Sequence, residues 1–233
     1  MIVPALRPDA ELRRCLDSVR LVFPDPGTCE IVLVLPADHL REGLDCYPGV
    51  RVVAETRRGV YGAMNDGVAA SLGQFVYFLG KDDIVLPAMG EAAALLQTTR
   101  PRALFCDVYW GDEGVRRGRP LKWLLLIKNV CQQGILYSRA TVLQHGPFLR
   151  KLRVQADHLL NIRVLWEPGH ARVAYFPVPV AWYAGTGLSF RSRDTQFHRV
   201  HAAIIGRYLG PAAACLWRGY RKLRPEKLPP HQG

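Results

Sequence analysis

The sequence predicts a single α/β domain in which an open, mixed sheet is flanked by helices. Over about the first 110 residues, segments typical of buried strands alternate with segments of helical periodicity. The chain of 233 residues is long enough for a substantial core, and its 49% hydrophobic and 22% charged residues are ordinary for a globular protein. No internal repeat, low-complexity tract or linker divides it, so one domain is expected.

Strands and helices alternate through the first half. An apolar start at 2–5 is too short to classify alone, and buried strands are predicted at 30–36, 50–54, 75–79 and 103–108. Three helices are predicted between these strands. The first is capped by Asp9 and continues to Val19, the second carries Met64, Val68 and Leu72 on one face and ends at Gly73, and the third runs from Pro87 to Leu96.

The second half is less regular. A Gly- and Arg-rich loop is expected at 112–120, a short strand at 134–137, and helices at 141–145 and 157–164. Residues 173–183 have strand character but contain Pro177 and Pro179. Because proline cannot donate a hydrogen bond to a strand ladder, this segment is predicted to be an edge strand.

The net charge of +11 is concentrated near the C-terminus, where residues 191–227 carry nine basic and two acidic side chains. In this tail, 191–233, apolar residues recur at helical spacing beside basic ones, which predicts a basic amphipathic helix. Such a helix suits an anionic membrane surface, with contacts expected from Leu216, Trp217, Tyr220 and Arg221. The alternative is a helix packed on the domain with a solvated basic face.

The sequence shows no pattern typical of a signal peptide or a membrane span, and its six cysteines lack the spacing of a zinc site. These observations predict a cytoplasmic protein, peripheral on the inner face of the plasma membrane if the tail binds lipid. The positive charge would also suit a nucleic-acid-binding protein, but no binding motif accompanies it, so no nucleic acid is expected.

Asp82 and Asp83 are the strongest candidates for chemistry because they follow the predicted strand at 75–79. Ligands of open α/β sheets bind at the carboxyl ends of strands, and adjacent carboxylates there suit a divalent cation that neutralises phosphate. Taken alone, such a pair is more often a turn with two solvated acids.

The residues around this pair resemble the central block of family 2 glycosyltransferases, which have a GT-A fold. Thirteen positions agree in register with the pattern E-x-D-x-G-[IV]-Y-D-A-M-N and its continuation to D-D, namely Glu55, Gly59, Val60, Tyr61, Ala63, Met64, Asn65, Gly67, Gly73, Phe78, Leu79, Asp82 and Asp83. Further blocks follow in the family's order at 4–19, 133–139, 146–148, 154–160 and 187–189.

The resemblance covers about residues 1–190 and implies a GT-A-type, Rossmann-like domain. Residues to about 110 would bind the nucleotide sugar, and residues 111–190 would bind the acceptor. The family's activity is expected: inverting, metal-dependent transfer of one sugar from a nucleotide-diphosphate sugar, most readily a UDP-sugar, to a hydroxyl. The acceptor would be a glycan or a polyprenyl-linked molecule in surface polysaccharide assembly.

The resemblance also implies roles for individual residues. Asp83 and Asp82 would hold Mn²⁺ or Mg²⁺, and Asp157 would be the general base, with a helix N-cap as the alternative for Asp157. The implied donor-binding residues are Pro4, Asp38, Glu55, Asn65 and Asp82, and the implied acceptor-side residues are Gln133, Gly187 and Ser189.

Several of these residues also have structural interpretations. For Glu55 the two alternatives are contact with the donor base and bracing of a loop. For Gln133 they are contact with the acceptor or the diphosphate and a role as a buried structural amide. For Asn65 the structural role is favoured. Tyr61 is expected in the core, and His158 is expected at the surface.

Four positions depart from the family pattern. Leu35 replaces the Asp that usually ends the second strand, which leaves only the shifted Asp38, while Arg57, Gly62 and Gln132 replace Asp, Asp and His. The metal aspartates and the expected base are intact, so the departures affect recognition of the donor base. They also motivate a second hypothesis, a catalytically decayed module that binds sugar nucleotides or glycans.

Overall fold

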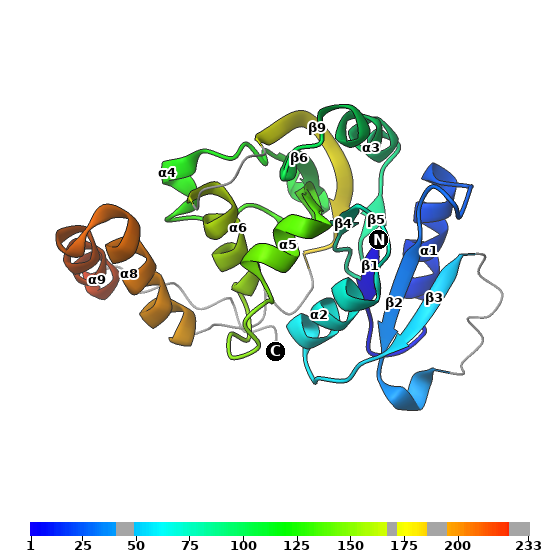
Figure 1. Cartoon of the computed structure of the whole chain (residues 1–233), viewed down its shortest axis with the longest axis horizontal. Coiled ribbons are helices and arrows are strands. Elements are labelled where there is room, and N and C mark those ends of the chain that lie inside the picture. The colour runs from blue at the N-terminus through cyan, green and yellow to red at the C-terminus, as the bar shows by residue number, and fades with distance from the viewer. Residues whose placement is uncertain (41–48, 167–171, 186–194, 224–233) are drawn as a thin grey trace.

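The computed structural model describes residues 1–40, 49–166, 172–185 and 195–223, and Figure 1 shows their arrangement. The N-terminal part contains a parallel sheet in the order β1-β2-β3, formed by β1 (Ile2–Pro4), β2 (Ile31–Leu35) and β3 (Val50–Ala54). The central strand β2 is buried along its whole length, as its continuous apolar run predicts.

The side chains of β2 alternate between two cores. Ile31, Leu33 and Leu35 pack with α1 (Ala10–Val22) and α3 (Ala88–Thr99) in one cluster. Val32 and Val34 face the opposite way and join a second cluster that includes α2 (Val60–Ala70), α5 (Arg139–His145) and α6 (Ala156–Trp166). Helices therefore cover both faces of the sheet, which is why this strand shows no polar alternation in its sequence.

The remaining strands form a mixed sheet in the order β4-β8-β6-β9-β5. Its members are β4 (Phe75–Tyr77), β5 (Ile84–Val85), β6 (Ala103–Trp110), β8 (Ile135–Ser138) and β9 (Val173–Tyr183), with β7 (Val115–Arg116) paired to β6. A parallel bridge between Ile2 and Phe78 joins the two sheets, and Leu79 N donates to Ile2 O at 3.0 Å. The prediction of an open mixed α/β sheet is confirmed.

The prediction that residues 173–183 form an edge strand is wrong. β9 lies between β6 and β5, parallel to the first and antiparallel to the second. The register against β6 jumps from Cys106↔Phe176 to Asp107↔Pro179, so the two prolines sit at a bulge. Pro177 falls in the bulge, outside the ladder, so its missing donor costs no strand pairing, and Pro179 is the residue at which the ladder resumes opposite Asp107.

The predicted loop at 112–120 contains the short strand β7 and a 3₁₀ turn, η2 (Gly111–Glu113). Of two further 3₁₀ turns, η1 (Ala37–His39) follows β2 and η3 (Gln132–Gly134) precedes β8. A short helix, α4 (Lys122–Leu125), lies between η2 and η3. Each of these elements is only two to four residues long, too short for periodicity to indicate it.

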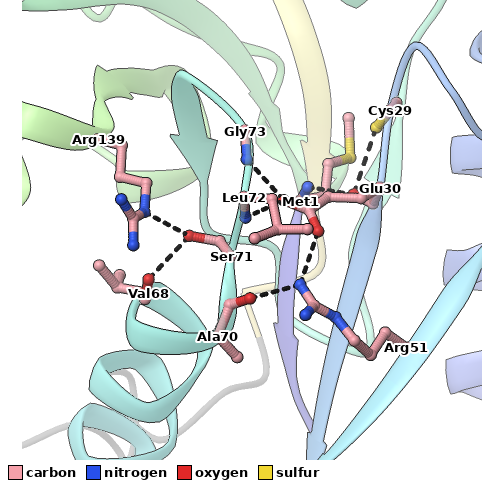
Figure 2. A network of polar contacts seen from close by, with 10 residues as sticks. All are labelled: Met1, Cys29, Glu30, Arg51, Val68, Ala70, Ser71, Leu72, Gly73 and Arg139. Atoms are coloured by element: carbon pink, nitrogen blue, oxygen red, sulfur yellow. Dashed lines mark hydrogen bonds and ion pairs between the residues drawn. The ribbon is translucent and has the colours of Figure 1, made fainter.

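The second helix ends earlier than its pattern predicts. α2 ends at Ala70, Ser71 is extended, and the side chain of Leu72 is 81% exposed rather than on the buried face. Figure 2 shows the cause: Glu30 Oε1 accepts hydrogen bonds from Leu72 N at 2.6 Å and Gly73 N at 2.7 Å. A carboxylate from the neighbouring strand segment thus takes up backbone donors that would otherwise continue the helix.

The same carboxylate joins other parts of this region. Arg51 Nη2 donates to Glu30 Oε2 at 2.8 Å and also to the carbonyl of Ala70, the last residue of α2. Arg139 Nε, at the start of α5, donates to the hydroxyl of Ser71 at 3.2 Å. β3, α2 and α5 are therefore tied together at the point where α2 ends.

The C-terminal region forms two helices, α8 (Thr195–Leu209) and α9 (Pro211–Leu223), at the end of the molecule opposite β1–β3 (Figure 1). α8 contributes Phe197 and Ile204 to the same core as α2 and α6. The core formed by earlier residues therefore extends into α8, beyond residue 190. Within the ranges that the structure describes, no helix is long and apolar enough to cross a membrane.

Replacing Glu30 by alanine removes the acceptor for Leu72 and Gly73 and the partner of Arg51. We expect the free energy of unfolding to fall by about 2 kcal/mol, because hydrogen bonds to a charged group are lost and their donors remain partly buried. Chemical denaturation of the purified variant measures this value. Glu91→Ala, which removes an exposed carboxylate on α3, is the matched control and should leave stability nearly unchanged.

Candidate active site

The turn that follows Phe78 and Leu79 presents the two aspartates. Gly80 N donates to Asp83 Oδ2 at 3.1 Å, and Asp83 N donates to Gly80 O at 3.1 Å. A Cβ atom on Gly80 would lie 2.5 Å from Asp83 Oδ2 and 2.8 Å from Asp82 Oδ1. The turn therefore requires glycine, because both carboxylates approach its backbone from the side where a side chain would stand.

The carboxylate of Asp83 is only 1% exposed and accepts hydrogen bonds on both oxygens. Ala184 N donates to Oδ1 at 3.0 Å, and Gln133 Nε2 donates to Oδ2 at 2.7 Å. Burial raises the pKa of Asp83 to about 7, although the hydrogen bond from Ala184 favours the charged form. The nearby charge of Asp82 raises the pKa further. A cation at this site would stabilise the ionised carboxylate.

Gln133 is held in place to make this contact. It lies on η3, where Tyr77 Oη donates to its carbonyl at 2.7 Å and Cys131 Sγ donates to its side-chain Oε1 at 3.2 Å. Gln133 is half-buried and its side chain binds the candidate metal ligand itself, while its contact with a ligand stays a prediction.

Asp82 is less buried than Asp83 and lies beside the N-terminal end of α1. Arg14 Nη2 donates to the carbonyl of Asp82 at 3.5 Å. The neighbouring Lys81 pairs with Asp9, the cap of α1, and with Glu11 at 2.7 Å. These contacts fix the turn against α1 and leave its carboxylates at the carboxyl end of the strand, where ligands of α/β sheets bind.

Asp82 and Asp83 fit a cation that is completed by its substrate. The structure gathers no cluster of three or more His, Cys, Asp or Glu side chains in the parts of the chain it describes, so a closed all-protein metal cage is not formed by these residues. Mg²⁺ in particular is commonly held by one or two carboxylates, with phosphate oxygens and water in the remaining positions. The two aspartates meet that requirement.

Asp157 forms a second centre in the first turn of α6. Tyr61 Oη donates to Asp157 Oδ1 at 2.7 Å, and Asn129 Nδ2 donates to Oδ2 at 2.5 Å. Burial raises the pKa of Asp157, and these two hydrogen bonds act in the opposite direction. α6 begins at Ala156, so Asp157 is not the residue that precedes the helix, as the N-cap alternative requires.

A chain of amides and hydroxyls supports Asn129 from behind. Asn161 Nδ2 donates to Asn129 Oδ1 at 3.0 Å, and Tyr137 Oη donates to Asn161 Oδ1 at 2.6 Å. Sequence reasoning missed Asn129, which lies 28 residues before Asp157 and belongs to no motif. It placed Tyr61 in the core, which its 8% exposure confirms, but did not predict the hydroxyl contact.

Segment 129–133 connects the two centres. Asn129 binds Asp157 and Gln133 binds Asp83. Asn129 and Gln133 are only four residues apart in the chain. Between them, burial raises the pKa of the Cys131 thiol, and the charges of Asp83 and Asp157 both add to that rise. The two carboxylates are therefore bound by residues at the two ends of one short segment.

The expected donor residues do not all meet at this site. Both heteroatoms of the Asn65 amide bind the backbone of Phe148, at 2.9 and 3.0 Å, so the structural role favoured for Asn65 is the one observed. Glu55 Oε1 accepts from Gly59 N at 2.7 Å, which braces the loop before α2. Pro4 ends β1 half-buried, and Asp38 is exposed on η1 beyond β2. Gly187 and Ser189 lie outside the described residues.

Two departures from the family pattern have structural counterparts. Leu35 is completely buried at the end of β2, so no carboxylate stands there, and the next acid along the chain is the exposed Asp38. A Cβ atom on Gly62 would lie 1.9 Å from the carbonyl oxygen of Arg57. The loop before α2 thus closes over position 62, and an aspartate there would require a different loop conformation.

A cavity of 190 Å³ lies beside Asn129, between α6 and the C-terminal helices. It is lined by Ile127, Lys128, Asn129, Gln155, His158, Phe197, His201, Trp217 and Arg221. His158 is 2% exposed, which corrects the expectation of a surface residue, because its Nε2 bonds to Leu125 O at 2.6 Å. Of the four expected membrane residues, Trp217 and Arg221 line this cavity, whereas Leu216 and Tyr220 are 76% and 48% exposed.

Comparison with known proteins identifies relatives of the chain. Residues 1–157 match the family model described as glycosyl transferase family 2. Curated proteins of Mycobacterium bovis and Mycobacterium tuberculosis, each named PGL/p-HBAD biosynthesis glycosyltransferase, are 32% identical over 219 residues. The alignments cover 84% of this chain and 81% of each relative.

Solved structures show the same fold at lower identity. Staphylococcus aureus TarS 1–349 in complex with UDP-GlcNAc superposes with a TM-score of 0.69 and 16% identity, covering 93% of this chain and 69% of that one. Mannosyltransferase PcManGT from Pyrobaculum calidifontis, in complex with GDP-Man and Mn²⁺, gives a TM-score of 0.59 and 17% identity, over 98% and 65% of the two chains. The predicted GT-A-type fold is thereby confirmed.

The raised pKa of Asp83 predicts how stability depends on pH without metal. The folded state binds the proton of the Asp83 carboxyl more tightly than the unfolded chain does. The stabilisation that this proton provides is therefore complete below about pH 4 and is lost as pH rises to about 7. Relative to Asp83→Ala, the wild-type free energy of unfolding should fall by up to about 4 kcal/mol over that range. Urea denaturation of both proteins across this pH range measures the difference, and parallel curves would contradict it.

Proposed function

The chain belongs to glycosyl transferase family 2, and on that premise we propose that it transfers one sugar, with inversion, from a nucleotide-diphosphate sugar to an acceptor hydroxyl. The observation that carries the proposal is segment 129–133, which holds Asp83 through Gln133 and Asp157 through Asn129. Inverting displacement needs charge neutralisation at the leaving group and a base on the opposite side of the reacting carbon. Asp83 and Asp157, held by the two ends of one short segment, are the carboxylates that we assign to these two roles.

Asp83 and Asp82 are the proposed holders of Mn²⁺ or Mg²⁺ on the donor side. A bound divalent cation would neutralise the diphosphate leaving group. Ala184, Gln133 and Gly80 keep the Asp83 carboxylate oriented, so its geometry is prepared before the donor binds. We propose a UDP-sugar as donor, in keeping with the nucleotide sugars bound to the structural relatives, and Asp38 and Glu55 as candidates for contacts to its nucleoside.

Asp157 is the proposed general base. A base works best when its pKa approaches the working pH, and burial moves the pKa of Asp157 upward in that direction. Tyr61 and Asn129 fix the carboxylate on both oxygens, so that it meets the acceptor hydroxyl in one orientation. The cavity beside Asn129 is the proposed site of the acceptor, a glycan or a polyprenyl-linked molecule in surface glycan assembly.

A binding module that has lost catalysis is the second candidate. The buried Leu35 favours it, since the carboxylate usual at that strand end is missing. Both candidates bind a nucleotide sugar, and they differ in turnover. We propose a cytoplasmic location for either one, with the transferase acting at the inner face of the plasma membrane.

Nucleotide binding tests the donor site directly. We expect one nucleoside diphosphate, UDP before GDP, CDP or dTDP, to raise thermal stability only with Mn²⁺ or Mg²⁺ present. A nucleotide present at a hundred times its dissociation constant adds about 2.7 kcal/mol to the free energy of unfolding. Asp83→Ala should abolish the effect, whereas Asp157→Asn should retain it and reduce sugar transfer roughly 100-fold or more.

Each result separates the candidates. Binding with transfer that depends on Asp157 supports the enzyme, and binding without transfer to any tested acceptor supports the decayed module. Stabilisation that persists in EDTA would contradict the metal-assisted donor site.

The Tyr61 hydroxyl provides a test of the base. Tyr61→Phe removes a hydrogen bond that favours the charged form of Asp157, so the pKa of this carboxyl should rise. The acidic limb of the pH profile of kcat should move to higher pH, by roughly one unit, while the KM for the donor stays unchanged. Tyr208→Phe, which alters a tyrosine at the C-terminal end of the molecule, is the control, and an identical shift in both variants would count against Asp157 as the base.

A further inference from the structure

Segment 121–128, which contains α4, presents large apolar side chains to solvent. Leu121, Trp123, Leu124 and Ile127 are 47%, 64%, 48% and 53% exposed. Isolated exposed leucines occur elsewhere, as at Leu143, but here four such residues lie within seven positions. Apolar side chains gathered in this way on a protein surface indicate a contact with another molecule or a membrane.

The backbone of this segment is fixed to the core. Leu125 and Leu126 are 1% and 0% exposed, so the opposite face of the segment is buried. Trp166 Nε1 donates to Lys122 O at 3.1 Å, the Leu125 carbonyl bonds to His158, and the Leu126 carbonyl bonds to His201. The exposed side chains are therefore displayed on an anchored element with a buried face of its own.

The sequence on either side of this segment is basic, which favours an anionic partner. From residue 114 to residue 156 the chain contains nine Lys and Arg and not one Asp or Glu. Lys122 and Lys128 lie within the apolar segment itself. Tryptophan and leucine beside lysine are the combination that binds the interface of an anionic bilayer, with rings at the headgroup level and ammonium groups on lipid phosphates.

We propose that segment 121–128 docks the protein on an anionic lipid bilayer. α9 also exposes Leu216, Tyr220 and Leu223, but its Trp217 is half-buried and lines the cavity together with Arg221. Trp123, by contrast, is 64% exposed, although one side of its ring packs against Trp166. α4 lies in the same half of the molecule as α8 and α9 (Figure 1). We therefore assign the main bilayer contact to segment 121–128.

Docking through this segment has a consequence for the active site. Asn129, which binds Asp157, follows Ile127 by two residues. A bilayer against segment 121–128 would place the base close to the lipid surface, where a lipid-linked acceptor presents its hydroxyl. This consequence rests on the proposed function, whereas docking itself does not and is measured without turnover.

Cosedimentation with vesicles tests the proposal on the full chain. The wild type should bind vesicles of phosphatidylcholine with phosphatidylglycerol and bind pure phosphatidylcholine weakly. Trp123→Gln/Leu124→Gln/Ile127→Gln should lower the partition coefficient at least roughly tenfold. Lys122→Gln/Lys128→Gln should remove the preference for phosphatidylglycerol, and with it the salt dependence of binding.

Two matched variants complete the experiment. Leu72→Gln/Leu143→Gln, which alters exposed leucines on other elements, should bind as the wild type does, and so should Leu216→Gln/Leu223→Gln on α9. Thermal stability and nucleotide binding of every variant show that the fold and the donor site are intact. Unchanged vesicle binding of the triple variant, or loss of binding in the α9 variant alone, would overturn the proposal whether or not the protein transfers sugar.

Discussion

The structure of the candidate active centre depends on one physical constraint: two carboxylates withdrawn from water, Asp83 fully and Asp157 in part, must each be supplied with hydrogen-bond donors. An isolated buried carboxylate is too costly to remain charged, so its surroundings must provide polar partners. Segment 129–133 provides one to each, through the amide of Asn129 for Asp157 and the amide of Gln133 for Asp83. Any movement of this segment would alter both centres at once, which couples the donor and acceptor sides through a few residues.

The remainder of the fold keeps that segment in position. The sheet residues Tyr77 and Tyr137 bind it directly or through Asn161, and the imidazole of His158 fixes the carbonyl of Leu125 just before it. Two cores on opposite faces of the sheet hold the strands from which these groups project. The polar contacts of the site are thus positioned by packing, since a tyrosine buried on a strand has little freedom to place its hydroxyl elsewhere.

The positive charge of the chain is unevenly distributed along the sequence. The tail carries part of it, but the acid-free stretch at 114–156 also carries nine basic residues and includes the exposed apolar segment. Positive charge beside exposed apolar side chains suits contact with an anionic surface. α8 packs into the same core as α2 and α6.

The sequence by itself determined the fold class, the family, most of the strands and helices, and the carboxylates Asp83 and Asp157 as candidates. These follow from local patterns: continuous apolar runs for buried strands, helical periodicity, and motifs in register. Only the tertiary structure decided the partners of those carboxylates, the end of α2 and the central position of β9. Asn129, Glu30 and the bulge at Pro177 and Pro179 act through contacts between residues distant in the chain or through register. No local pattern encodes such contacts, because they arise only when separate elements pack together.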